Sequence, residues 1–181
     1  MKKFYFIVFT LLIVAIPSVY ANDEYVLGPE DMIQILVWKN PELSITIPVR
    51  PDGRISVPLI GDVQASGYTT TKLSEVITKR LTAYVQAPNV TVILTQINSP
   101  KVFVMGRGAA SNVIILKRKT SLLELFSFIV LNPNSDLKNA SLIRNSERLP
   151  NRIKDLVVKG DLTQNIMLQP GDIVYIPDSF W

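Results

Sequence analysis

The spacing of apolar residues alternates between strand-like and helix-like stretches, which predicts an α+β fold. The runs at 32–38 and 90–97 are almost continuously apolar or β-branched, as in buried strands. Between them, residues 71–85 carry apolar side chains at intervals that indicate a helix with one buried stripe. The stripe consists of Leu73, Val76, Ile77, Leu81 and Tyr84. A threonine from 69–71 is expected to cap this helix, and Ala87-Pro88 to end it.

A β-hairpin is predicted between the first strand and the helix. Two β-rich runs, 45–49 and 54–63, are joined by Pro51-Asp52-Gly53. Proline presets φ for such a turn, aspartate tolerates its bend and glycine accepts a positive φ. Because Pro48 and Pro58 have no N–H to donate, we expect them at a strand edge, a bulge or a strand end.

A second group of elements follows Asn98-Ser99-Pro100, which we interpret as the boundary between two small units. Strands are predicted at 102–105, 112–116, 141–144 and 172–177. Ser121-x-x-Glu124 is a capping box that opens a predicted helix over 122–131. A short helix is expected over 153–159, ended by Gly160.

The same short pattern, Leu-x-Pro-x-Asp followed by an apolar run, occurs at 27–31 and 168–172. Proline fixes one torsion, and aspartate bonds to nearby backbone before the chain enters a sheet. The repeat suggests two units, each with a strand that begins in the same way.

Residues 1–21 have the order of a secretory signal peptide, with two lysines, an apolar run from Phe4 to Ile16 and small residues before an expected cleavage between Ala21 and Asn22. The run is shorter than the roughly 20 apolar residues of a spanning helix, so an uncleaved anchor is the less favoured alternative. A lipoprotein signal requires a cysteine, and the chain has none. We therefore expect an exported protein that is not lipidated.

Composition narrows the possible chemistry. Cleavage would leave 17 basic and 15 acidic residues with no basic stripe, which argues against nucleic-acid binding. Without His or Cys, the chain cannot form a Ser-His-Asp triad, a thiolate nucleophile or an ordinary zinc site, so no catalytic, cofactor or metal site is expected. A glycosidase-like carboxylate pair is the remaining enzymatic alternative. The acids available for it, which are better explained as turn formers, are Asp52, Asp62, Asp161 and Asp172.

Taken in chain order, these segments resemble the bacterial outer-membrane polysaccharide export family. The residues that carry the resemblance are Y-V-L-G-P-E-D-M-I-Q-I-L-V-W from Tyr25, V-R-P-D-G-R-I-S-V-P-L-I-G-D-V from Val49, and N-I-M-L-Q-P-G-D-I-V-Y-I-P from Asn165. The likeness implies a polysaccharide-export domain over 22–98 and a soluble-ligand-binding β-grasp (SLBB) domain over 99–181.

The resemblance also implies a role in transport. Family members form homo-oligomeric rings in the periplasm, associated with the outer membrane, that conduct capsular or extracellular polysaccharide. They work with an inner-membrane polysaccharide copolymerase, and they neither make nor break bonds.

Three features depart from the family pattern. There is no cysteine to acylate, and only four residues follow Pro177, too few for a membrane-spanning C-terminal helix. The chain thus resembles the short class, which would need an outer-membrane partner such as a β-barrel. The expected SLBB loops are also atypical at 106–108, 111–112 and 129–131.

A few residues are candidates for contacts. The turn Arg50, Pro51, Asp52, Gly53 and Arg54 could face a ring lumen or a subunit interface, or be a solvated hairpin tip. Trp38 could contact glycan or a partner, or pack at the rim of the core. Phe180 and Trp181 could dock a partner or pack back on the domain. A monomeric carbohydrate- or protein-binding module is the main rival function.

Overall fold

The computed structural model describes residues 24–179. The predicted signal peptide with its cleavage site at Ala21 and Asn22, and the C-terminal pair Phe180 and Trp181, lie outside the described residues. Helices and strands alternate along the chain, which confirms the α+β prediction. Among residues 24–179, no helix has the length and apolarity that crossing a bilayer would take.

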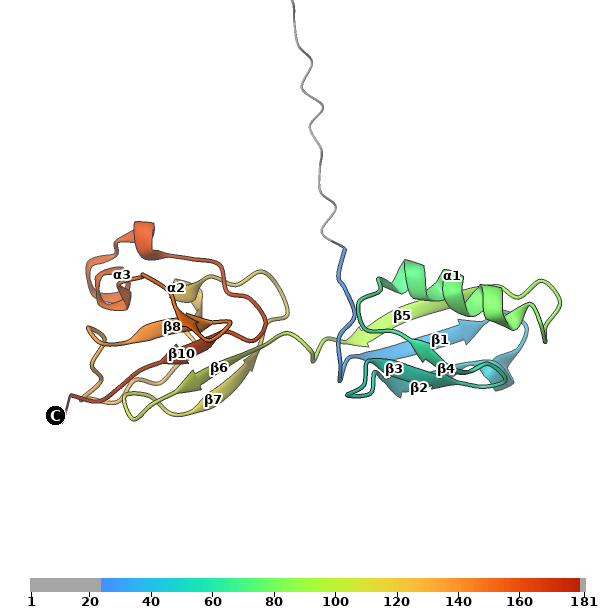
Figure 1. The fold of residues 1–181 in the computed structure, drawn as a ribbon, viewed down its shortest axis with the longest axis horizontal. Helices are drawn as coiled ribbons and strands as arrows, with labels where there is room; N and C mark the ends of the chain where they lie inside the picture. Colours follow the sequence, from blue (N-terminus) through green and yellow to red (C-terminus); the bar gives the residue numbers. More distant parts are fainter. Residues whose placement is uncertain (1–23, 180–181) are drawn as a thin grey trace, which may run out of the picture.

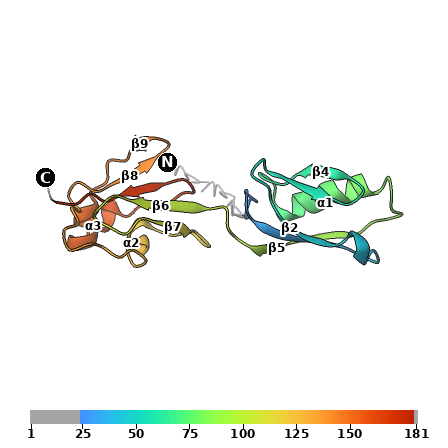
Figure 2. The same cartoon turned by 90° about the horizontal axis from the view of Figure 1, so that it is seen from below.

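The first half of the chain forms an antiparallel sheet in the order β2-β1-β5, with a helix and a separate hairpin packed on it. Its elements are β1 (Met32–Val37), η1 (Pro41–Leu43), β2 (Ile45–Pro48), β3 (Arg54–Val57), β4 (Gly61–Gln64), α1 (Thr70–Leu81) and β5 (Val90–Gln96). Inward side chains of β1 such as Ile33 and Ile35 are fully buried, as are Leu73 and Ile77 of α1. In Figure 2, α1 and β4 lie on one side of this sheet and leave its other face open.

The prediction that the runs 45–49 and 54–63 pair with each other in a hairpin is wrong. β2 pairs with β1, with Ile45 opposite Ile35, and β3 pairs with β4 instead of β2. The run 54–63 folds on itself because Pro58 interrupts it and Leu59 and Gly61 both take a positive φ. The Pro51-Asp52-Gly53 segment is a turn, but it connects two different sheets. Pro48 and Pro58 lie at strand ends, as predicted.

The helix α1 begins as predicted and ends early. The Thr69 hydroxyl accepts a hydrogen bond from the backbone N of Lys72 at 3.2 Å and caps the first turn. The helix stops at Leu81, where the Thr82 hydroxyl donates back to the carbonyl of Lys79 at 2.7 Å. Tyr84 is therefore outside the helix and exposed, which makes its predicted place in the buried stripe wrong.

The second half of the chain forms a five-stranded sheet in the order β7-β6-β10-β8-β9. Its elements are β6 (Lys101–Met105), β7 (Asn112–Ile115), α2 (Leu122–Leu125), β8 (Ser141–Arg144), β9 (Glu147–Arg148), α3 (Ile153–Lys159), η2 (Leu162–Gln164) and β10 (Ile173–Tyr175). The first strand, β6, and the last, β10, lie parallel at the centre, and all other neighbours are antiparallel. A mixed sheet with parallel first and last strands and a helix after the second strand agrees with the expected β-grasp-like unit. Helices α2 and α3 lie on one face of it (Figure 2).

The helix predicted over 122–131 is only four residues long. The Ser121 hydroxyl accepts from the backbone N of Glu124 at 3.2 Å, so half of the capping box forms, while the Glu124 carboxylate pairs with Arg118 instead. The helix ends because the next residues are drawn into contacts with an earlier loop: Leu131 bridges to Ala109, and Ala110 N donates to the carbonyl of Val130. The short helix α3 and its end at Gly160, with φ of 69°, are as predicted.

The buried apolar residues form two clusters with no common member, one within 27–92 and the other within 102–176. Figure 1 shows two bodies joined by the stretch between β5 and β6. The interval between the two clusters contains the predicted domain boundary between residues 98 and 99, which stays a prediction.

The repeated Leu-x-Pro-x-Asp pattern forms the same turn twice. Each aspartate carboxylate accepts the backbone N three residues earlier, Asp31 from Gly28 at 2.9 Å and Asp172 from Gln169 at 2.8 Å. Proline occupies the second position, and the third has a positive φ, 73° at Glu30 and 90° at Gly171, as in a type II turn. A buried aspartate thus starts both β1 and β10, which confirms the predicted role of the pattern.

The first of these aspartates also fixes the connection between the two units. Asp31 Oδ1 accepts the backbone N–H groups of Asn98 and Ser99, both at 2.8 Å. Its Oδ2 accepts the Tyr25 hydroxyl at 2.7 Å and the Ser99 hydroxyl at 3.1 Å. Burial alone would raise the pKa of Asp31, but the hydrogen bonds, from Gly28 N first and then from Asn98 N and Tyr25, lower it overall. We call this set of contacts the Asp31 clamp.

Candidate functional site

The turn that carries the strongest family motif is held by Arg50. Its guanidinium donates to the Asp62 carboxylate at 3.0 and 3.1 Å and to the Ser56 hydroxyl at 3.0 Å. A second ion pair joins it to Asp52, two residues along the turn. Arg50 therefore ties the turn to the β3–β4 hairpin.

The electrostatics of this turn are nearly balanced. Hydrogen bonds from Arg50 lower the pKa of Asp52, and hydrogen bonds from Ser56 and then Arg50 lower that of Asp62. Both carboxylates stay ionised at neutral pH and offset the charge of Arg50. The guanidinium of Arg54 is exposed and makes no side-chain ion pair within residues 24–179, which leaves it as the free cation of this turn.

Gly53 fits the turn tightly. Its φ is 77°, and an added Cβ would lie 2.9 Å from the Ser66 side chain. Its carbonyl accepts the backbone N–H groups of Ala65 and Ser66 at 2.9 and 2.8 Å. The Arg50–Arg54 segment is thus a rigid surface feature built around these contacts.

Trp38 follows the last residue of β1, and its side chain is 71% exposed. Val37 points into the core, so the strand alternation turns Trp38 outward. It does not pack at the rim of the core. Trp38 lines a shallow groove of about 320 Å³ together with Lys39, Asn89 and Thr91.

A feature that sequence reasoning missed is the open face of the second sheet. On four adjacent strands, the side chains that face away from α2 and α3 are almost all apolar. Lys101 and Ser141 are the polar exceptions on this face, and the apolar members are Phe103, Met105, Val113, Ile115, Ile143, Ile173 and Tyr175. Five of these seven are exposed to solvent, Val113 at 50%. A sheet with one solvated face usually alternates apolar and polar residues, so we name this surface the open sheet face and treat it as a candidate interface.

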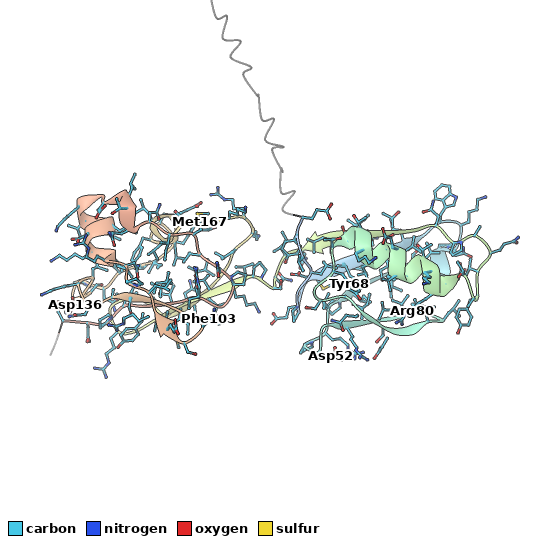
Figure 3. The ribbon with its side chains drawn as sticks, turned by 45° about the horizontal axis from the view of Figure 1, so that its top comes forward. Asp52, Tyr68, Arg80, Phe103, Asp136 and Met167 are labelled. Atoms are coloured by element: carbon cyan, nitrogen blue, oxygen red, sulfur yellow. The ribbon has the colours of Figure 1, made fainter. Side chains whose placement is uncertain are left out.

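The open sheet face and the Arg50 turn belong to different units. In Figure 3, Asp52 and Arg80 lie on the first unit and Phe103 on the second. Four strands of 3 to 5 residues, spaced about 4.8 Å apart, give the face a footprint on the order of 300 Å². Patches of that size on a monomer are often functional.

The geometry does not favour the enzymatic alternative. A glycosidase acid needs a raised pKa to hold its proton, whereas the pKa values of Asp52, Asp62 and Asp161 are all lowered by hydrogen bonds. The fourth acid, Asp172, is fully buried and forms a bidentate ion pair with Arg144 at 2.7 and 2.8 Å. Within residues 24–179, no cluster of three or more acids could hold a metal ion.

Comparisons with known proteins point to polysaccharide export. Residues 19–95 match the family model described as polysaccharide biosynthesis/export protein. The chain is 31% identical over 86 residues to the polysialic acid transport protein KpsD of Escherichia coli, an alignment that covers 47% of this chain and 15% of KpsD. It is 29% identical over 128 residues to the capsule polysaccharide export outer membrane protein CtrA of Neisseria meningitidis, covering 67% of this chain and 31% of CtrA.

The chain therefore spans only a minor part of the length of the relatives that it matches. The matched region contains β1 to α1, β5 except its last residue, the Arg50 turn, Trp38 and Asp31. Over the first unit, the chain is thus similar to polysaccharide export proteins, and the motifs that carry the resemblance lie on these matched elements.

Proposed function

We propose that this chain is a periplasmic subunit of a polysaccharide export channel, exported by a cleaved signal peptide and associated with the outer membrane. The observation that carries the proposal is the match of residues 19–95, nearly all of the first unit, to the family model of polysaccharide biosynthesis/export proteins. The names of the two relatives, one a polysialic acid transport protein and one a capsule polysaccharide export protein, support glycan as the cargo.

The second part of the proposal is that copies of the chain associate into a ring. The open sheet face supports it, because seven apolar side chains on one surface favour burial against another protein. Its footprint of about 300 Å² is less than the roughly 800 Å² per partner of a standard interface. The face would thus form the apolar centre of a contact that neighbouring polar residues complete. A channel of this kind also requires an inner-membrane copolymerase and an outer-membrane partner, such as a β-barrel, which we propose as its partners.

Light scattering on the chain from Asn22 onward tests self-association. We expect a defined oligomer for the wild type and a monomer for Val113→Lys, because Lys cannot be buried unpaired in an apolar contact. Val158→Lys is the matched control: Val158 is 64% exposed on α3, on the other side of the sheet. A wild type that stays monomeric at high concentration would favour the rival reading of a monomeric binding module.

Deletion of the gene tests the transport role. Surface glycan is expected to fall while polymer accumulates inside the envelope, and the wild-type gene supplied in trans restores export. Shortened glycan produced by the purified chain would instead support the enzymatic alternative.

A further inference from the structure

Trp38 is the most exposed aromatic side chain within residues 24–179. The backbone around it is nevertheless fixed. Trp38 N donates to the carbonyl of Asn89 at 2.9 Å, and Asn40 N donates to the carbonyl of Val37 at 3.0 Å, which closes a turn over Trp38 and Lys39. The Asn40 amide also donates to the Trp38 carbonyl at 3.1 Å. The indole of Trp38 is thus exposed, while hydrogen bonds fix the backbone that carries it.

Lys39, next to Trp38, has a strained backbone. Its φ is 63°, a conformation that few residues other than glycine adopt. Strained positions persist where the surrounding structure holds them, and they cluster at functional sites. Here the turn closed by Asn40 holds Lys39 beside Trp38 at the end of β1.

Three polar side chains that line the groove have no hydrogen-bonding or ionic partner among residues 24–179. Within residues 24–179, the side chains of Lys39, Asn89 and Thr91 make no hydrogen bond or ion pair, whereas the Ser44 hydroxyl is occupied by Val37 N and the Asn40 carbonyl. The groove therefore offers one indole, one ammonium group, one amide and one hydroxyl. Its lining includes one cation and no carboxylate.

These groups match the chemistry of an acidic sugar. The C–H face of a pyranose packs on an aromatic ring, whose negative face attracts the polarised hydrogens. Hydroxyl groups of the sugar can bond to an amide and a hydroxyl, and a carboxylate to an ammonium group. A few placed polar groups around an apolar surface are typical of small-molecule sites.

We propose that the groove at Trp38 binds one residue of an anionic polysaccharide, with the sugar ring stacked on Trp38 and its carboxylate bound by Lys39. The proposal rests on the proposed export function for the choice of a glycan. It adds the class of glycan, namely one that carries carboxylate groups, and the place where the chain contacts it.

The second unit contains a groove that serves as an internal control. It has a volume of about 580 Å³, and Tyr175 lines it together with Arg107, Asp136 and Asp178. In Figure 3, Asp136 lies at the outer end of this unit. Two carboxylates against one guanidinium repel a carboxylated sugar, so this aromatic groove is not expected to bind the same ligand.

The test is titration calorimetry on the purified chain from Asn22 onward, with hexamers of galacturonic acid and of sialic acid as acidic probes and maltohexaose as the neutral probe. We expect at least one acidic hexamer to bind and maltohexaose to bind at least tenfold more weakly. Trp38→Leu is expected to weaken acidic binding at least tenfold. Lys39→Gln is expected to abolish the preference for acidic over neutral hexamer and to remove most of the salt dependence of binding. Phe128→Leu, which removes an exposed aromatic side chain outside both the Trp38 groove and the open sheet face, is expected to bind like the wild type.

Several results would overturn the proposal. Binding of neither acidic hexamer, equal binding of acidic and neutral hexamers, or wild-type affinity in Trp38→Leu would each do so. A drop in the oligomer mass of Trp38→Leu with unchanged glycan binding would assign the groove to a protein contact instead. Circular dichroism confirms folding of the variant, since an exposed indole contributes little to the core. A lack of glycan binding at Trp38 would not change the phenotype expected for the gene deletion. The export function and this binding site are therefore tested separately.

Discussion

The Asp31 clamp predicts that one buried carboxylate sets the relative arrangement of the two units. The perturbation is Asp31→Asn, which keeps the shape of the side chain but replaces one acceptor oxygen with a donor. Asp31 accepts five hydrogen bonds, three from backbone N–H groups and two from hydroxyls. An asparagine oxygen can serve one side of this set, so at least one buried N–H faces the new amide without an acceptor.

The cost follows from the bonds lost. A hydrogen bond to a charged acceptor contributes about 1.5–3 kcal/mol, and an unsatisfied buried donor costs about 1–3 kcal/mol. We therefore expect Asp31→Asn to lower the free energy of unfolding of the first unit by about 2–4 kcal/mol. For a unit of this size, that corresponds to a loss of roughly 10 °C or more in Tm.

The matched control is Asp172→Asn, which alters the same turn in the second unit. It leaves Arg144 without its carboxylate, so it should destabilise the second unit by a comparable amount. Asp172 makes no contact with residues 97–100, however, and the arrangement of the units should not change.

The assay is the distance between two spin labels, one on each unit. The chain has no Cys, so Glu75→Cys and Val158→Cys introduce two unique labelling sites at exposed positions. We expect a narrow distance distribution in the wild type and in Asp172→Asn, and a broad one in Asp31→Asn. A distribution in Asp31→Asn as narrow as that of the wild type would refute the role of the clamp.

Two further predictions concern pH and the Arg50 turn. Hydrogen bonds lower the folded-state pKa of Asp31 below its unfolded value of about 3.9, so its contribution to stability is present above about pH 4 and lost as the pH falls through the folded pKa. In urea unfolding between pH 7 and pH 2.5, the free energy of unfolding should therefore fall below about pH 4, and it should fall less in Asp31→Asn. An equal fall in both proteins would contradict this prediction. Gly53→Ala should cost about 2–4 kcal/mol, through its positive φ and the approach to Ser66, whereas Gly67→Ala, with φ of 86° but no atom within 4 Å of the added Cβ, should cost about 1–2 kcal/mol. Equal Tm values for the two glycine variants would show that the close approach at Gly53 carries no cost.

Local features could be predicted from the sequence because their contacts are local. The two Leu-x-Pro-x-Asp turns depend on a carboxylate that reaches three residues back, and the Thr69 cap on a hydroxyl that reaches three residues forward. Neighbours in the sequence make both contacts, so residue type and spacing indicate them.

Contacts between distant segments could not be predicted in the same way. Asp31 bonds to residues 67 and 68 positions further on, and nothing in its turn indicates that the linker returns there. The pairing of β2 with β1 was missed because the Pro51-Asp52-Gly53 turn is as compatible with a change of sheet as with a hairpin.

The exposure of Trp38 and of the open sheet face could not be predicted, because these residues lie in continuously apolar stretches of the sequence. Residues 102–105 are apolar at every position, so the pattern predicts a strand but does not indicate which of its faces is open; in the structure, Phe103 and Met105 face solvent. Trp38 is exposed for a similar reason: Ile33, Ile35 and Val37 point inward, so the position after Val37 points outward.

The most direct test of the account is the ratio of retained to surface polysaccharide in cells whose only copy of this chain is Val113→Lys. If the chain exports glycan as an assembly joined through the open sheet face, retained polymer rises and surface polymer falls, while cells with Val158→Lys keep the wild-type ratio. A wild-type ratio in Val113→Lys cells, with the purified variant shown to be monomeric, would contradict it.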